Sequence, residues 1–274
     1  MRPPRELPLP FSAPMVRAVN EERKKQTRRL KGLHVINEDP GAWEWDRIQV
    51  GYRDGRPRYV FHSEGDPVGI ACPYGAPGDF LWVRETWRPW SWHEGEPITV
   101  EYAAGGPRRE ISGRTLAEDD AISAWEERIW ISLSEELNAK GVKCGEAGIY
   151  RWEGESPVRW RPSIHTPKWA ARIWLRVTDV RVERVQEITE ADAIAEGVEH
   201  PPEPWPNMGM GGGSAMEAAA QDRWRARYGT WHVDQYLALW DSLNADRGYE
   251  WASNPWVWVV TFARTTPGHP GGEA

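Results

Sequence analysis

The chain has 274 residues, of which 40% are hydrophobic and 27% charged, and this is the composition of a globular protein rather than of a disordered chain. Its 34 Lys and Arg residues stand against 41 Asp and Glu, so the net charge is −7 and any contact with a polyanion requires a local basic patch. The two cysteines exclude a disulfide framework and a Cys-rich zinc ribbon.

No stretch of the sequence has the apolar length of a membrane span, and the first residues lack the apolar core of a signal peptide. We therefore expect a protein of a reducing cytoplasm without a membrane partner. Tryptophan is unusually frequent, with 19 Trp against 4 Phe and 8 Tyr, although the mean hydropathy is only −0.68. Either Trp replaces Phe and Leu in the core, or some indoles line a pocket that stacks on bases or sugars.

The first half of the chain alternates between clear and weak signals. Residues 12–22 begin with Ser-Ala-Pro and predict a helix, and residues 23–31 follow as a basic turn or strand. Residues 47–62 predict a hairpin around an Asp-Gly turn. Residues 77–87 predict a tight turn that leads into a buried strand, and residues 88–158, which include a helical stretch, are interpreted as an insertion.

The signals are sharper after residue 160. Residues 160–169 contain two prolines and are expected to be extended or turned. Residues 172–185 predict a long strand with a bulge near Thr178. Thr189 is expected to cap a short helix that ends at Gly197.

The remaining segments complete the outline of the chain. Residues 200–215 are interpreted as a linker or loop, residues 216–228 and 233–245 as helices, residues 256–263 as a buried strand, and the last ten residues, 265–274, as a disordered tail.

Strands dominate these predictions, which favours an α+β fold, specifically a small, mostly antiparallel β-barrel with helical additions. We expect a single domain over residues 1–264, with insertions at about 88–158 and 200–246.

The first candidate site is the basic segment 17–31, in which seven cations against two acidic side chains give a local net charge of +5. Such a segment suits contacts with phosphates, and it equally suits a solvated helix end whose charges complement the helix dipole.

Within this segment, Lys24 precedes Thr27 by three residues. A hydroxyl becomes a good nucleophile only when a base removes its proton, and a Lys amine is such a base only when burial or nearby cations lower its pKa. Lys25, Arg28 and Arg29 are candidate sources of that positive field. The spacing alone is weak evidence, since it occurs in many unrelated sequences.

The second candidate site is the run Arg84, Glu85, Thr86 and Trp87. A strand places Glu85 and Trp87 on one face, where a carboxylate and an indole together suit the edge and the face of a base. The alternative is a structural ion pair between Arg and Glu.

The third candidate site is the stiff segment 159–169, with Trp160, Arg161, Ser163 and His165. Interleaved cations and aromatic rings suit a nucleotide or a single-stranded nucleic acid. The other His residues show no zinc spacing relative to His165, so we expect neither a metal nor another cofactor.

The fourth candidate is Glu196, near the end of the short helix after the long strand. The helix dipole disfavours a negative charge at this end, and this favours the protonated carboxyl that a general acid requires. The alternative is an ordinary solvated helix face.

Several segments, in this order, resemble the ASCH domain family, a branch of the PUA-like β-barrel superfamily. The segment EERKKQTRR resembles the G-R-K-T-x-T-x-R signature that opens these domains. The segments PGDFLWVRETW, WLRVTDVRVERVQEITEADAIAEGV and WVWVVTF are similar to the family's later strands and helix. With WRPSIHTPKWA and Trp240 to Asn244, the chain is similar to a phage and prophage subgroup, and about half of it is covered.

The resemblance implies a PUA-like fold and ligands drawn from RNA, nucleotides and modified nucleosides. One bacterial ASCH group hydrolyses the amide of N4-acetylcytidine with a Lys base, a Thr nucleophile and a Glu proton donor. Aligned by motif, these three roles fall on Lys24, Thr27 and Glu196. If the protein is encoded by a phage, its compartment is the cytoplasm of the bacterial host.

Three functions follow as hypotheses. The first is an amidohydrolase that removes an acyl group from the N4 amine of a modified cytidine. The second is a non-catalytic module that binds single-stranded or modified nucleic acid. The third, a structural protein of a phage, has little support because the sequence has no coiled coil. The first two require Lys24, Thr27 and Glu196 to face one cavity together with Trp87 or Trp160.

Overall fold

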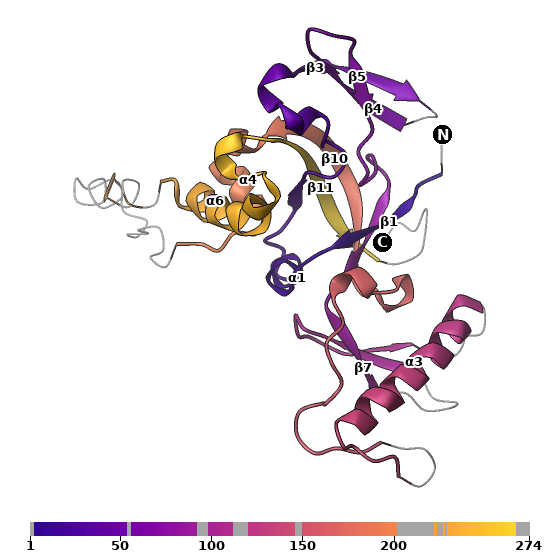
Figure 1. Cartoon of the computed structure of the whole chain (residues 1–274). Coiled ribbons are helices and arrows are strands. Elements are labelled where there is room, and N and C mark those ends of the chain that lie inside the picture. Colours follow the sequence, from indigo (N-terminus) through magenta and orange to yellow (C-terminus); the bar gives the residue numbers. More distant parts are fainter. Residues whose placement is uncertain are drawn as a thin grey trace.

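The computed structural model describes residues 3–53, 56–91, 98–111, 120–145, 150–201, 222–223, 227 and 229–266. A central five-stranded sheet has the strand order β1-β6-β10-β11-β2 (Figure 1). Its strands are β1 (Glu6–Pro10), β2 (Gln26–Arg29), β6 (Phe80–Arg84), β10 (Trp174–Arg184) and β11 (Trp256–Thr265). Neighbouring strands are antiparallel except β1 and β6, which are parallel.

Two three-stranded antiparallel sheets accompany the central sheet. One contains β3 (Glu44–Arg53), β4 (Arg56–His62) and β5 (Val68–Ile70), and the other contains β7 (Trp87–Ser91), β8 (Ile98–Tyr102) and β9 (Arg109–Ile111). The helices are α1 (Ala13–Asn20), α3 (Asp120–Ala139), α4 (Glu190–Ala195) and α6 (Trp231–Asn244). Short 3-10 turns are η1 (Ile36–Glu38), η2 (Pro40–Ala42), η4 (Ser163–His165), η5 (Lys168–Ala170), η6 (Val185–Glu187), η7 (Ala245–Arg247) and η8 (Trp251–Ser253).

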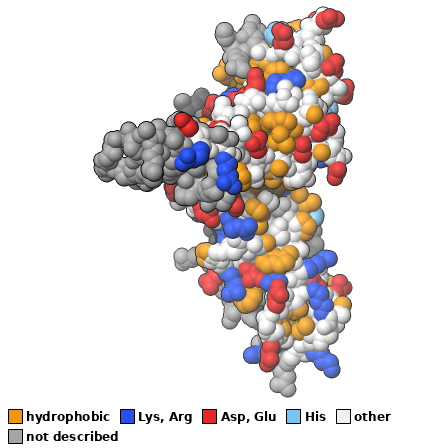
Figure 2. All heavy atoms as spheres, turned by 90° about the vertical axis from the view of Figure 1, so that its left-hand side faces the viewer, with side chains coloured by type: hydrophobic (Ala, Val, Ile, Leu, Met, Phe, Trp, Pro, Cys, Tyr) orange, Lys and Arg blue, Asp and Glu red, His pale blue; other side chains and the backbone are white. Residues whose placement is uncertain are grey.

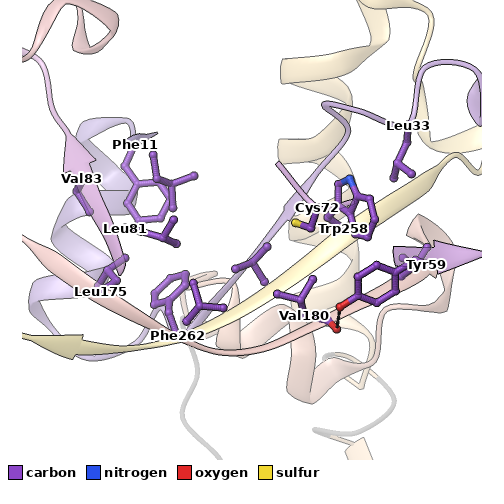
Figure 3. Packing of buried hydrophobic residues seen from close by; sticks show 14 of the residues in the cluster. Phe11, Leu33, Tyr59, Cys72, Leu81, Val83, Leu175, Val180, Trp258 and Phe262 are labelled. Atoms are coloured by element: carbon purple, nitrogen blue, oxygen red, sulfur yellow. Dashed lines mark hydrogen bonds between the residues drawn. The ribbon is translucent and has the colours of Figure 1, made fainter. Parts of the chain in front are cut away.

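The fold is therefore α+β, as the sequence predicts, but the described strands do not close into a barrel. The outermost strands of the central sheet, β1 and β2, do not pair with each other. The sheet instead buries one face under the β3–β4 hairpin, where the ring of Tyr59 lies 4.9 Å from that of Trp258 (Figure 3). The Tyr59 hydroxyl donates a hydrogen bond of 2.7 Å to the carbonyl oxygen of Val180. Packing of one layer on another thus replaces edge-to-edge closure.

Tryptophan serves mainly as core in this structure. Trp258 and Trp87 are among the largest completely buried side chains, and Trp174, Trp240 and Trp256 are also buried. The third sheet and α3 form a separate apolar cluster around Trp87 and Leu133, which lies below the central sheet in Figure 1. Among the described residues, no helix combines the length and the apolar character that crossing a bilayer requires.

Several local predictions are confirmed. The long strand β10 shifts its register against β11 between Val177 and Asp179, which is the bulge expected near Thr178. The Thr189 hydroxyl accepts a hydrogen bond from the backbone N–H of Asp192 and caps α4, and Gly197 ends it with a φ of 87°.

The expected strand over residues 77–87 is wrong in its extent. β6 ends at Arg84, and Trp87 begins β7 in another sheet, where its backbone pairs with Tyr102. Between the two strands, Glu85 is buried and forms an ion pair of 2.8 Å with Arg172. The chain leaves the central sheet at this residue.

Other predictions lie outside the described residues. These are the Asp54-Gly55 turn, most of the loop over 200–215, nearly all of the helix over 216–228 and the tail from residue 267 onward.

Gly197 connects α4 to the segment before β2, and a substitution there tests this contact. A Cβ at Gly197 would lie 2.8 Å from the Cβ of Ala18 and 2.9 Å from that of Lys24. We expect Gly197→Ala to lose about 1–2 kcal/mol of unfolding free energy from its left-handed φ and about 1–3 kcal/mol more from overpacking. Denaturant unfolding measures this loss.

Gly248→Ala is the matched control, because Gly248 has a φ of 78° and a Cβ there would meet no described atom within 4 Å. This control is expected to lose only the backbone contribution. Equal losses for the two variants would contradict the close contact at Gly197.

Candidate active site

A cavity of about 260 Å³ opens between β2, α4 and α6. β2 is the outermost strand of the central sheet, and the consecutive residues 27–31 all line the cavity, which places it along the outer edge of this strand. The other lining residues come from α1, from the loop before β6, from the end of α4 and from α6 with the turn after it: Met15, Tyr74, Glu196, Tyr236, Leu239, Trp240, Leu243, Asn244 and Arg247.

Glu196, which lines this cavity, belongs to a buried ion pair with Lys24, which does not line it. The Lys24 Nζ lies 2.9 Å from Oε2 of Glu196 and donates a second hydrogen bond of 2.7 Å to the Glu196 carbonyl oxygen. The two side chains are 1% and 4% exposed. The backbone holds them together, because residues 24 and 196 form an isolated β-bridge and the N–H of Lys25 donates to the carbonyl oxygen of Ala195.

Glu196 is also bound by a second cation. Arg28 Nη1 lies 3.3 Å from Oε1 of Glu196, and its Nη2 lies 2.9 Å from Glu183 and 3.4 Å from Asp192. Burial raises the pKa of Asp192, but hydrogen bonds from Gln26 and Thr189 and the charge of Arg28 outweigh it and lower this pKa to about 2. Arg28 is therefore neutralised by three carboxylates.

The environment of Lys24 lowers its pKa below 10.5. Burial is the largest cause, and the charges of Arg29 and Arg28 act in the same direction, while Glu196 opposes them. A lowered pKa is the direction of change that a Lys amine requires in order to serve as a base. Burial likewise raises the pKa of Tyr236 well above 10, so its phenol remains a hydrogen-bond donor.

Thr27 lines the cavity from β2 and is 2% exposed. Its hydroxyl makes no hydrogen bond to another residue in the described part of the chain. Strand alternation places Thr27 and Arg29 on one face of β2. The ring centroid of Phe11 lies 5.5 Å from both Lys24 Nζ and Arg29 Cζ, so one aromatic ring contacts both cations.

The structure thus brings Thr27 and Glu196 to one cavity, with Arg28 and Arg29 beside them, whereas Lys24 does not line it and is connected to it through its ion pair with Glu196. It does not bring Trp87 or Trp160 to this cavity, and the expectation that one of them shares it is wrong. The physical reason is the break after β6, which places Trp87 in the third sheet.

Aromatic residues of α6, rather than Trp87 or Trp160, line this cavity. Tyr236 and Trp240 line the cavity, together with the half-exposed Leu239 and Leu243. Their helical spacing is visible in the sequence, but it is equally typical of an ordinary core stripe. The neighbourhood of β2 and α6, which are more than 200 residues apart, has no signal in the sequence.

Trp87, Trp160, Arg161 and His165 line a second cavity of about 360 Å³, with Arg159, Pro162 and Ile129. Trp160 is 38% exposed, and the guanidinium of Arg88 lies 4.2 Å from its ring centroid.

The remaining predicted ligand-binding residues make structural contacts. Glu85 pairs with Arg172, which fits the alternative of a structural Arg–Glu pair, although the partner is not Arg84. Arg84 donates to the carbonyl oxygen of Ile164 and lies over the Trp82 ring. Ser163 begins a 3-10 turn in which its carbonyl oxygen accepts from Thr166.

Among the described residues, no three His, Cys, Asp or Glu side chains are grouped so that they could hold a metal ion. Comparisons of the chain with protein-family models, with curated proteins and with solved structures give no match. The function is therefore argued from the geometry and electrostatics of the site.

The lowered pKa of Lys24 predicts how stability depends on pH. Between this lowered pKa and 10.5, the unfolded chain binds more protons at Lys24 than the folded protein does, so unfolding free energy rises with pH. We expect the wild type to gain stability relative to Lys24→Met by up to about 1.4 kcal/mol per pH unit in this window. Denaturant unfolding of both proteins at a series of pH values measures the difference, and a difference that falls as pH rises toward 10.5 would contradict the lowered pKa.

Proposed function

We propose that this chain is an ASCH-like, PUA-like protein of the bacterial cytoplasm and an amidohydrolase that removes an acyl group from the N4 amine of a modified cytidine. The observation that carries the proposal is that Thr27 and Glu196 line one cavity, and that Glu196 is held there by its buried ion pair with Lys24. The order of the ASCH-like segments supports the same assignment, because the three residues with these chemical types come from two separate segments of that signature.

The buried pair supplies a base and an acid at once. In water a Lys ammonium is the stable form, but the buried environment of Lys24 lowers its pKa and so favours the loss of its proton. Transfer of one proton along the 2.9 Å contact leaves a neutral amine and a carboxylic acid with the same total charge. Lys24 is then ready to accept a proton and Glu196 to donate one.

The first half of the reaction forms an ester on Thr27. Its hydroxyl loses its proton to Lys24 Nζ, and the oxygen attacks the acyl carbon of the amide. Glu196 gives its proton to the exocyclic nitrogen as the C–N bond breaks, so cytidine leaves with an intact amine. Lys24 is now an ammonium and Glu196 a carboxylate.

Water completes the cycle. Glu196 takes a proton from a water molecule whose oxygen attacks the ester carbon, and the Thr27 oxygen leaves with the proton held by Lys24. The carboxylic acid departs, and all three residues return to their starting forms. No cofactor is needed for this sequence of steps.

The shape of the cavity supports a small substrate. Its 260 Å³ lies just below the range of about 300–1,000 Å³ typical of small-molecule sites, which suits a single nucleoside unit rather than several stacked bases. Tyr236 and Trp240 offer aromatic surface for the base, and Leu239 and Leu243 offer apolar surface for the acyl chain.

The experiment that tests this function is a deacylation assay on N4-acetylcytidine. We expect Thr27→Ala to lose at least about 10³-fold in kcat/KM, since it removes the nucleophile, and Thr27→Ser to retain more activity because it keeps a hydroxyl. The pH profile is expected to be bell-shaped, because the active pair of Lys24 and Glu196 holds one proton. Activity is lost on the alkaline side when this proton leaves, and this is expected below pH 10.5 because the pKa of Lys24 is lowered.

Ser12→Ala, a change on the exposed residue before α1, is the control for handling and folding. Full turnover by Thr27→Ala would refute the nucleophile, and the absence of turnover by the wild type on both N4-acetylcytidine and its 5′-monophosphate would refute the proposed reaction.

The second cavity favours the alternative function, a module that binds single-stranded nucleic acid without catalysis. Arg88 is anchored by the carbonyl oxygens of Ser156 and Val158 and lies against the ring of Trp160, which holds this half-exposed indole in place. An indole fixed beside Arg159 and Arg161 is a platform on which a base stacks. Figure 2 shows basic and acidic side chains interspersed over the lower part of the molecule, where the third sheet and α3 lie, so stacking rather than a broad positive field supports this alternative.

Binding of a short single-stranded RNA, followed by fluorescence anisotropy, tests the alternative. We expect Trp160→Ala to weaken binding by about 5- to 150-fold, equivalent to about 1–3 kcal/mol for one stacked base. Trp43→Ala, which alters another partly buried indole outside this cavity, is the control. Unchanged affinity in Trp160→Ala would remove this alternative.

A further inference from the structure

The active-site cavity is strongly positive in a protein whose net charge is −7. Among the described residues that line it, Glu196 is the acidic side chain, whereas four are cationic: Arg28, Arg29, Lys31 and Arg247. Charged side chains are costly to bring together without counterions, so the partners of each cation determine how much positive charge is left for a ligand.

Arg28 is fully compensated by Glu183, Asp192 and Glu196. The other three cations differ from it. Within the described part of the chain, Arg29, Lys31 and Arg247 form no ion pair with a carboxylate. Glu196 does not compensate them, because its two oxygens are bound by Lys24 and Arg28.

The two guanidinium groups among these cations are held by neutral groups instead. Arg29 Nη2 donates to the carbonyl oxygen of Pro10 at 3.0 Å, and its buried Nε has no hydrogen-bond partner among the described residues. Arg247 Nη1 lies 3.4 Å from Oδ1 of Asn244. Both guanidinium groups therefore keep donors that an anion would satisfy.

Arg29 comes from β2 and Arg247 from the turn after α6, yet the charges of both affect the pKa of Tyr74. Burial raises the pKa of Tyr74, and the charges of Arg29 and Arg247 oppose that increase. Two guanidinium groups from distant segments thus lie near one residue of the cavity wall. Lys31 and Arg247 are exposed, which places this positive end of the cavity at its opening.

We propose that Arg29, Lys31 and Arg247 form a phosphate-binding subsite, so that the substrate of this cavity is a phosphorylated nucleoside rather than a neutral one. The identity of the base rests on the proposed function, but the phosphate subsite rests on the three cations alone. Arg side chains present paired N–H donors that match phosphate oxygens, and a doubly charged phosphate would be the missing counterion.

The phosphate has two sources, a free nucleotide or the backbone of a nucleic acid. Both present the same oxygens to the three cations. An opening lined by exposed Lys31 and Arg247 is compatible with either source, and the length of the bound ligand distinguishes them.

Isothermal titration calorimetry with cytidine, cytidine 5′-monophosphate and a cytidine-containing hexaribonucleotide tests the subsite, using the full chain. We expect the monophosphate to bind at least about tenfold more tightly than cytidine, which corresponds to one hydrogen-bonded charge pair. This preference is expected to shrink about tenfold in Arg247→Gln and in Lys31→Gln, and to weaken with added salt. Both residues are exposed, so the variants are expected to keep the wild-type melting temperature.

Arg17→Gln is the matched control, because it removes an exposed cation of the same basic segment that does not line the cavity. Equal affinity for cytidine and its monophosphate, no binding of the monophosphate, or an equal loss in Arg17→Gln would overturn the proposal. A hexanucleotide that binds more tightly than the monophosphate, with the same dependence on Arg247, identifies a nucleic-acid substrate, and equal affinities identify a nucleotide.

The same titrations separate this proposal from the proposed reaction. Cytidine and its monophosphate carry no acyl group, so their binding does not depend on turnover. A protein that prefers the monophosphate but deacylates neither N4-acetylcytidine nor its 5′-monophosphate has the phosphate subsite without the amidohydrolase activity. A protein that deacylates the nucleoside and shows no preference for phosphate has the activity without the subsite.

Discussion

The buried pair of Lys24 and Glu196 is the constraint on which the site depends. Two ions removed from water lose hydration that their mutual attraction repays only when the geometry is close and the remaining polar atoms are satisfied. Here the backbone bridge between residues 24 and 196 fixes that geometry, and the Glu196 carbonyl oxygen and Arg28 complete the hydrogen bonding. An apolar pair would fill the same space at lower cost, so stability alone does not account for this arrangement. The contact also requires Gly197, whose missing side chain lets the end of α4 approach Ala18 and Lys24.

Local features of the fold could be predicted because each has a local physical cause. Thr189 caps α4 because its hydroxyl accepts a hydrogen bond from the backbone. Gly197 adopts a left-handed conformation because it has no Cβ. The bulge in β10 lies where the alternation of apolar residues changes. β1 was missed because two prolines in five residues disfavour a strand, although an edge strand tolerates them. The barrel expectation failed because closure depends on which strands meet in space. Nothing in the sequence of the β3–β4 hairpin indicates that it covers a face instead of joining an edge.

The site shows the same division. Lys24, Thr27 and Glu196 could be proposed together only through the resemblance to ASCH domains, since residues 27 and 196 are too far apart in the chain for spacing to relate them. The indoles were assigned to the wrong cavity because the strand from Phe80 was expected to continue to Trp87. That strand ends before Glu85, which is buried in an ion pair with Arg172, a residue 87 positions later in the chain. The periodicity of the sequence cannot reveal such a long-range ion pair. As a result, Trp87 and Trp160 were predicted at the wrong cavity.

The charge distribution would also give the proposed phosphate subsite a selectivity that the overall composition does not show. A net charge of −7 repels polyanions from most of the surface, while the uncompensated cations at one opening attract an anion once it is within about a Debye length of 8–10 Å. A long nucleic acid must also place its other phosphates against the acidic remainder of the protein, whereas a mononucleotide meets only the positive end. Under the proposed function, the balance between these two ligands would depend on the surface around the cavity, and the indole of Trp160, beside Arg88, Arg159 and Arg161, is the described feature best suited to offset that repulsion by stacking.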